Sequence, residues 1–255
     1  MNYAKSLSTT EIQPDGITAL FMGQTDIDTG LWFPIKKMTW KYLNGEYVDL
    51  KTVFTHGAEK LKNMYPEKTP FLLSGNLKRI IKNKNIYSCL WRNRMPLNRK
   101  LDPSLFSSLG LSPNPPYDPI SYVSRSGGYR YGDTNDLFPE ILPDPNGDYH
   151  FIFRPVDSYV FANPNQPELE TIRKGEIVTP QLVKDQIKLS CQSRIIGVAP
   201  GYIRELIKKY QEQLSIKIYQ VNYGLPLEYQ FLCQATLNRN SGIPFTELEY
   251  QPQSV

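Results

Sequence analysis

Apolar and polar residues alternate over several parts of the chain, and this pattern predicts a protein built mainly of β-strands. The longest alternating run covers residues 227–237. A period of two residues is typical of a strand, because successive side chains point to opposite faces of a sheet. Shorter runs rich in β-branched and aromatic residues predict further strands. These lie at 17–22, 31–35, 38–43, 47–54, 149–153, 187–189, 195–198 and from Ile216 onward.

Helices are expected to be few. Residues 202–214 place apolar side chains at the helical period, with basic side chains opposite them, and predict the longest helix. Shorter helices are expected at 58–64, ending before Pro66, and at 104–109. The fold class predicted from these patterns is mainly β with minor helices, an α+β arrangement.

Glycine and proline mark the connections between these elements. Asn44-Gly45, Gly127-Gly128 and 145–147 predict turns, and 162–168 predicts a loop. Residues 101–119 hold five of the 21 prolines, which indicates an irregular connection around the short helix expected there.

Composition narrows the class of protein. Of 255 residues, 40% are hydrophobic and 21% are charged, a mix typical of globular proteins. Apolar runs are too short to cross a bilayer, and the first residues lack the apolar segment of a secretion signal, so we expect a cytoplasmic protein. Three dispersed cysteines argue against a disulfide framework or a zinc knuckle, and two histidines leave little for imidazole catalysis. We therefore expect a non-enzyme without a cofactor or metal.

Motifs for nucleotide binding and hydrolysis are missing from the sequence, and this agrees with a non-enzyme. Residues 133–136, Asp-Thr-Asn-Asp, could hold a cation through oxygen ligands, but the spacing favours a capped turn. A metal-dependent nuclease around Asp133 and Asp136 stays as a lesser alternative. Asp144, with Asn146 and Asp148, favours a hairpin turn over a metal site for the same reason.

Positive charge is concentrated in residues 78–100, although the net charge is only +4. This stretch contains no acidic residue, and Tyr87 and Trp91 lie within it. Basic and aromatic side chains in alternation suit a phosphate backbone with stackable bases, while the alternative is a solvated face. The eight basic residues are Lys78, Arg79, Lys82, Lys84, Arg92, Arg94, Arg99 and Lys100.

Tyrosine is abundant, with 17 residues, and several tyrosines have a basic neighbour in the sequence. Tyr122 with Arg125 and Tyr202 with Arg204 are examples. Such pairs suit base stacking, but tyrosine is equally common in cores and protein interfaces.

Five segments in a fixed order resemble the uncharacterised bacterial proteins that carry a HIRAN domain without an attached helicase. From the first to the last, these segments span about 200 residues, and the HIRAN core corresponds to residues 150–215. The segments are GLWFPIKKMTW (30–40), VFTHGAEKLKNMYP (53–66), SRSGGYRYGDTNDLFPEILPDPNGDYHF (124–151), RIIGVAPGYIRELI (194–207) and QVNYGLPLEYQFLC (220–233).

The resemblance implies a small β-barrel related to the OB fold, which in DNA-remodelling helicases binds single-stranded DNA at a free 3′ end. It implies an aromatic pocket position at Tyr159, with Arg154 nearby, and a motif tail that includes Lys184. The family's Asn-Pro-Tyr-Asp-like motif is replaced here by residues 180–183, Pro-Gln-Leu-Val. We therefore expect two regions: a β-rich region with short helices (1–148), and a HIRAN-like barrel with a C-terminal helix and strands (149–255).

These observations predict a non-catalytic nucleic-acid-binding module, for single-stranded DNA or DNA ends, in a DNA-processing or defence system. The alternative is a protein-interaction subunit of a larger complex, in which the HIRAN pocket has decayed. The predicted nucleic-acid-binding residues are Arg154, Tyr159, Lys184, Tyr202, Arg204, Lys78, Arg79, Lys82, Lys84, Trp91, Arg92 and Arg94.

Overall fold

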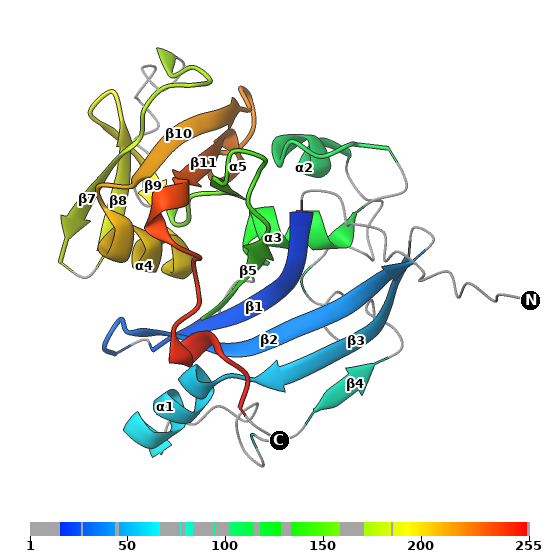
Figure 1. The fold of residues 1–255 in the computed structure, drawn as a ribbon. Helices are drawn as coiled ribbons and strands as arrows, with labels where there is room; N and C mark the ends of the chain where they lie inside the picture. Colours follow the sequence, from blue (N-terminus) through cyan, green and yellow to red (C-terminus); the bar gives the residue numbers. More distant parts are fainter. Residues whose placement is uncertain are drawn as a thin grey trace, which may run out of the picture.

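The protein is mainly β, with few helices and with antiparallel pairing throughout the described strands (Figure 1). The computed structural model describes the following parts of the chain: residues 16–26, 28–43, 46–66, 77, 80–83, 94, 103–114, 118–128, 134–158, 171–184 and 186–253.

A five-stranded sheet forms the first part of the fold, with the strand order β4-β3-β2-β1-β5. Sequence patterning located β1 and β3, but predicted two short strands where the structure has one long strand, β2. It did not predict β4 or β5. The strands are β1 (Ile17–Thr25), β2 (Trp32–Leu43), β3 (Glu46–Phe54), β4 (Ile81–Asn83) and β5 (Asn135–Ile141).

Three helices accompany this sheet: α1 (His56–Met64), α2 (Pro103–Ser108) and α3 (Pro119–Ser126). The first two were predicted, whereas α3 was not. Asp118 caps α3 by accepting hydrogen bonds from the backbone N–H of Ile120 (2.9 Å) and of Ser121 (3.3 Å). Gly127, at φ 72°, ends the helix in the left-handed conformation that favours glycine. The Gly127-Gly128 turn predicted from the sequence is thus the end of a helix.

Two three-stranded sheets form the second part of the fold, with the orders β10-β11-β6 and β7-β8-β9. Neither closes on itself among the described strands. Two isolated antiparallel bridges, Val156–Val198 and Ile177–Lys217, connect the two sheets. The strands are β6 (Tyr149–Phe153), β7 (Thr179–Val183), β8 (Gln186–Cys191), β9 (Arg194–Val198), β10 (Leu214–Val221) and β11 (Phe231–Leu237).

The second part of the fold differs from the sequence prediction at both of its helices. Helix α4 (Gly201–Tyr210) ends before Leu214, which begins β10. The alternating run at 227–237 divides into a helical turn, α5 (Leu227–Gln230), and strand β11. The backbone N–H of Tyr229 donates to Pro226 O (2.8 Å), a local bond that favours the turn over an extended strand.

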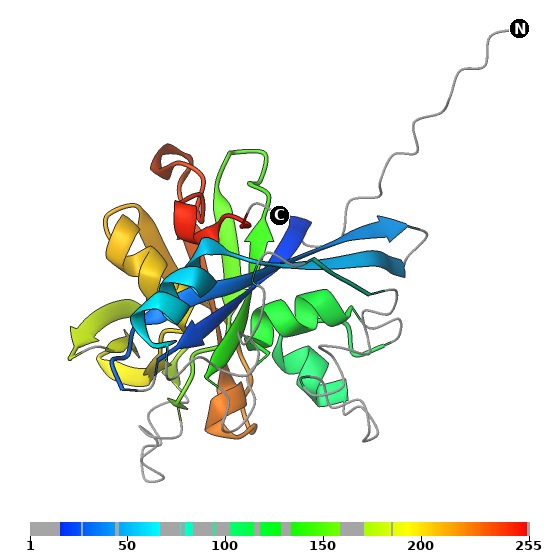
Figure 2. The ribbon, with the colours of Figure 1, turned by 90° about the horizontal axis from the view of Figure 1, so that it is seen from below.

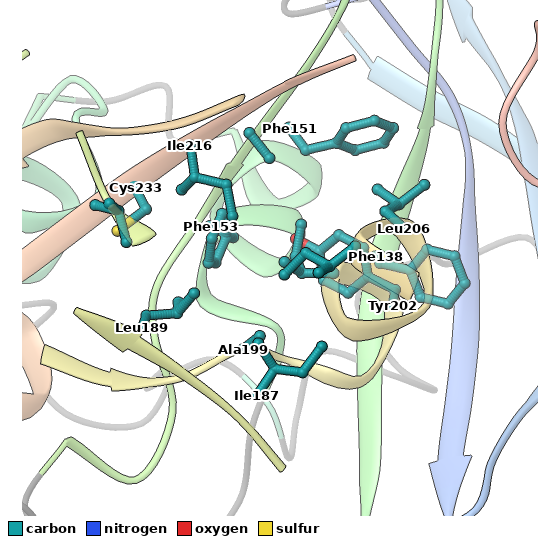
Figure 3. Close-up of a cluster of buried hydrophobic side chains, with 14 of the residues drawn as sticks. Phe138, Phe151, Phe153, Ile187, Leu189, Ala199, Tyr202, Leu206, Ile216 and Cys233 are labelled. Carbon is teal, nitrogen blue, oxygen red and sulfur yellow. The ribbon is translucent and has the colours of Figure 1, made fainter. Parts of the chain in front are cut away.

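One aromatic core joins the two predicted regions. It combines Phe21, Trp32 and Phe138 of the first with Phe151 and Tyr202 of the second. Tyr202 stacks on Phe138, with ring centroids 5.0 Å apart and an interplanar angle of 9° (Figure 3). The boundary predicted at residue 148 therefore falls within a continuous core.

The C-terminal segment returns to the first sheet. Gln253 N–H donates to Phe54 O (3.0 Å), and Thr55 forms an antiparallel bridge with Pro252. A short 3-10 turn (Leu248–Tyr250) contacts α1, and Figure 2 shows this segment beside α1. The chain therefore starts and finishes its described course against the same sheet.

Trp32 occupies the centre of the junction between the two parts. A Cβ atom at Gly23 would lie 2.3 Å from the indole, and one at Gly201 would lie 2.2 Å from it. The indole N–H donates to Asp136 Oδ1 (2.9 Å), and the ring lies 5.2 Å from that of Phe138. Because Gly23 is on β1 and Gly201 begins α4, the indole fixes how closely these two elements approach.

Adding a methyl group at Gly201 should destabilise the protein through Trp32. We expect Gly201→Ala to lower the free energy of unfolding by about 1–3 kcal/mol, because the three closest atoms to the new methyl all belong to the indole. In a Trp32→Leu background the same change should cost less. Urea-induced unfolding of the four proteins of this double-mutant cycle measures the coupling. An equal cost in both backgrounds would show that the indole does not limit this approach.

Candidate nucleic-acid interface

Most of the basic stretch at 78–100 lies outside the described residues, including Lys78, Arg79, Lys84, Trp91 and Arg92. The two predicted contacts that are described lie apart in the fold. Lys82 is exposed on the edge strand β4, beside Lys51 of β3. Arg94 donates from Nη1 to Gly128 O (2.6 Å), so at least part of its guanidinium holds the end of α3.

Tyr202 and Arg204 are not at the surface, and this corrects their predicted role. Tyr202 has no exposed area, and its ring stacks on Phe138, so neither face is available to a base. Arg204 is 8% exposed and donates from Nε to Glu205 (3.4 Å). Helix α4 buries more of its surface than the predicted apolar face, because it packs in the junction between the two parts of the fold.

Asp136 accepts hydrogen bonds that connect elements of the fold. Its carboxylate accepts from the Trp32 indole, and the backbone N–H of Tyr202 also bonds to it. Burial raises the pKa of Asp136 above 3.8, although these hydrogen bonds and the nearby charge of Arg204 act in the opposite direction. Pro200 gives the helix no side-chain cap, so Asp136 supplies that bond from β5. Asp133 lies outside the described residues, and no group of three potential metal ligands occurs among those described.

Lys184 is exposed at the turn between β7 and β8, in the left-handed region at φ 57°. It can therefore reach a ligand in solution. The strand before it presents apolar side chains to solvent, since Leu182 is 69% exposed. Tyr159, the other pocket position implied by the resemblance, is outside the described residues.

Arg154 is the predicted contact with the most distinctive surroundings. It follows β6, and its guanidinium carbon lies 4.7 Å above the centre of the Tyr229 ring. Removal from water lowers its pKa below the usual value of arginine, and the largest opposing influence is the nearby Tyr229. No ion pair between described residues involves Arg154. Glu228 favours the charged form of Arg154 but is not within ion-pair distance. A guanidinium that is largely removed from water and has no ion pair is a candidate anion site.

Three elements hold this cluster in place. The backbone N–H of Arg154 donates to Arg125 O (3.1 Å) at the end of α3. Tyr122, one turn earlier on α3, packs its ring 5.0 Å from that of Phe106 on α2. Asn222 donates to both Tyr229 O (2.7 Å) and Ser108 O (2.9 Å), and so ties α5 to α2.

Two further cation–aromatic pairs occur in the same segment of chain that carries Tyr229. Arg173 lies 5.6 Å from the ring centre of Tyr223 and donates to its hydroxyl (2.6 Å). Lys174 lies 5.5 Å from the ring centre of Tyr219. Residues 219–229 thus provide three tyrosines, and each is paired with a basic side chain from a distant part of the sequence.

Sequence reasoning named Arg154 but missed its partners. It noted Tyr122 beside Arg125, yet gave Tyr219, Tyr223 and Tyr229 no role. The spacing of these three tyrosines is visible in the sequence, YQVNYGLPLEY (219–229). Their basic partners are not visible there, because strand pairing and the α5 turn bring them together.

Residues 144–148 form a turn, as the sequence predicted, but not a hairpin, because β5 and β6 on either side of it belong to different sheets. Asp144 Oδ1 accepts from the backbone N–H of Asn146 (2.8 Å) and of Asp148 (2.9 Å), and Oδ2 lies 3.2 Å from His150 Nε2. An ionised carboxylate only accepts, so His150 Nε2 donates to Asp144, and His150 Nδ1 lies 3.1 Å from the Thr236 hydroxyl oxygen. This chain of bonds fastens the turn to β11.

A comparison with family models, with curated proteins and with solved structures finds no match. Among the described helices, none combines the length and apolarity needed to cross a bilayer.

The Asp144 turn predicts a loss of stability in acid. Hydrogen bonds from Asp148 and His150 lower the pKa of Asp144 from 3.8 to about 2. A carboxyl group with a lowered pKa stabilises the folded state above its unfolded pKa, and this contribution is lost as the pH falls from 3.8 to about 2. We expect Asp144→Asn to be less stable than the wild type near neutral pH, with a smaller difference near pH 2. Chemical denaturation at both pH values measures this, and a difference that stays constant would contradict it.

Proposed function

We propose that this protein is a non-catalytic, cytoplasmic module that binds single-stranded nucleic acid, with DNA as the preferred ligand, in a DNA-processing or defence system. The observation that carries this proposal is Arg154, which is largely desolvated, stacked on Tyr229 and without an ion-pair partner among the described residues. A phosphate would compensate its charge.

The neighbouring cation–aromatic pairs support a single strand as the ligand. Unpaired bases stack on tyrosine rings, and each such contact contributes about 1–3 kcal/mol. Tyr223 is 50% exposed, which leaves ring surface accessible beside Arg173. Lys184 would add a phosphate contact at the β7–β8 turn.

A HIRAN-type barrel is part of this proposal. The Val156–Val198 bridge connects β6 with β9, and the Ile177–Lys217 bridge connects the start of β7 with β10. With these two bridges the strands follow one another as β6-β11-β10-β7-β8-β9 and back to β6. This circuit supports a barrel related to the OB fold, although the two sheets are connected only by single bridges and not by continuous ladders.

A second candidate function, binding of a protein partner, is favoured by the apolar surface near β7. Ile177 is 70% exposed and borders a 330 Å³ groove between the start of β7 and β10. Leu182 adds to the exposed apolar surface at the sheet edge. However, Pro180 lacks an N–H, and prolines on edge strands reduce strand addition. We therefore rank this function second.

Binding of labelled single-stranded DNA, followed by fluorescence anisotropy at two salt concentrations, tests the nucleic-acid proposal. We expect binding that weakens steeply with salt, because phosphate contacts release counterions. Arg154→Ala should weaken binding about tenfold or more, the effect of losing charge-assisted hydrogen bonds.

Arg239→Ala is the matched control for this experiment. Arg239 is exposed just beyond the far end of β11 from Tyr229, so its loss should leave affinity nearly unchanged. An Arg154→Ala protein that binds like the Arg239→Ala protein would remove Arg154 from the interface. Loss of binding in Lys82→Ala alone would instead assign the site to the 78–100 stretch. If the wild-type protein does not bind DNA at either salt concentration, the proposal is wrong and the second function takes its place.

A further inference from the structure

Arg154 forms no ion pair with a described residue. Tyr229 covers one face of the guanidinium at 4.7 Å, and the nearby carboxylate of Glu228 favours its charged form. A cation–aromatic contact offsets only part of the free energy that it costs to remove a charged group from water. A bound anion would therefore stabilise this arrangement more than any contact that the described residues make.

Two hydroxyl groups accompany the guanidinium. Tyr122 and Tyr229 are both close enough to Arg154 to interact with it electrostatically. Burial raises the pKa of Tyr122 above 10, so its hydroxyl keeps its proton and can donate a hydrogen bond. Neither hydroxyl donates a hydrogen bond to another described residue. Tyr122 is 9% exposed.

Together these groups resemble the donor set that a phosphate requires. A guanidinium offers up to five N–H donors in a planar fork, and stacking on Tyr229 leaves its edge available. The two phenolic hydroxyls add one donor each. The positions are fixed before any ligand arrives, because Arg125 O holds the Arg154 backbone, Phe106 packs on Tyr122 and Asn222 holds α5.

We propose that Arg154, Tyr122 and Tyr229 bind a phosphate monoester, at the end of a nucleic-acid strand. This inference rests on the proposed function and names the part of the ligand that the site recognises. A terminal phosphate carries about −1.5 to −2 charge near neutral pH, more than the single charge of a phosphate within a strand. A terminal group can also approach this half-buried site from one side, whereas an internal phosphate brings a nucleoside on both sides.

Oligonucleotides of one sequence, with a 5′-phosphate, a 3′-phosphate or hydroxyls at both ends, provide the test. We expect one phosphorylated form to bind about tenfold more tightly than the hydroxyl form. Tyr122→Phe and Tyr229→Phe should each reduce this preference several-fold. Both variants remove only a hydroxyl, so they test the site even if Arg154→Ala fails to fold. Tyr149→Phe, which removes a hydroxyl at the other end of β6, is the matched control.

The outcomes separate this inference from the proposed function. Equal binding of all three oligonucleotides would overturn the phosphate-end inference and leave nucleic-acid binding in place. If no oligonucleotide binds, but inorganic phosphate or a nucleoside monophosphate raises the melting temperature of the wild type and not of Tyr122→Phe, the site binds free phosphate monoesters and the nucleic-acid function is wrong. If neither strands nor free phosphates bind, both are wrong.

Discussion

The packing of Trp32 is the constraint on which the rest of the structure depends. Its indole lies so close to Gly23 and to Gly201 that a Cβ atom at either position would clash with it. Its N–H bonds to Asp136, and that carboxylate also accepts from the N-terminus of α4. A single side chain thus joins β1, β2, β5 and α4, and the aromatic core of Phe138 and Tyr202 continues from it. Because of this junction, the two parts predicted from the sequence share one core.

The same junction explains why the candidate site forms where it does. Strand β5 continues through the 144–148 turn into β6, and β6 ends at Phe153, directly before Arg154. Helix α3 contacts both β5 and β6, so its end meets the Arg154 backbone at Arg125 O. Helices α2 and α5 then complete the cluster through Asn222. The site is therefore built from local turns and helix ends supported by a rigid sheet, an arrangement that suits binding.

Sequence patterning gave the mainly β class and most strands, because alternation and β-branched residues report burial on one face of a sheet. It missed α3, a helix of eight residues that begins at the Asp118 cap and ends at Gly127. It placed Tyr202 at a ligand surface, because a tyrosine beside Arg204 looks the same in sequence whether it is buried or exposed. The partners of Arg154 could not be predicted either, since α3 and α5 reach it only through tertiary packing.

Photocross-linking of a bromouracil-substituted single strand to the wild-type protein tests the central claim most directly, because it locates the bases on the protein. The account predicts adducts in peptides from 219–229, with Tyr223 or Tyr229 modified, and their loss in Arg154→Ala but not in Arg239→Ala. Adducts confined to 78–100, or no adducts at a concentration where the strand binds, would contradict it.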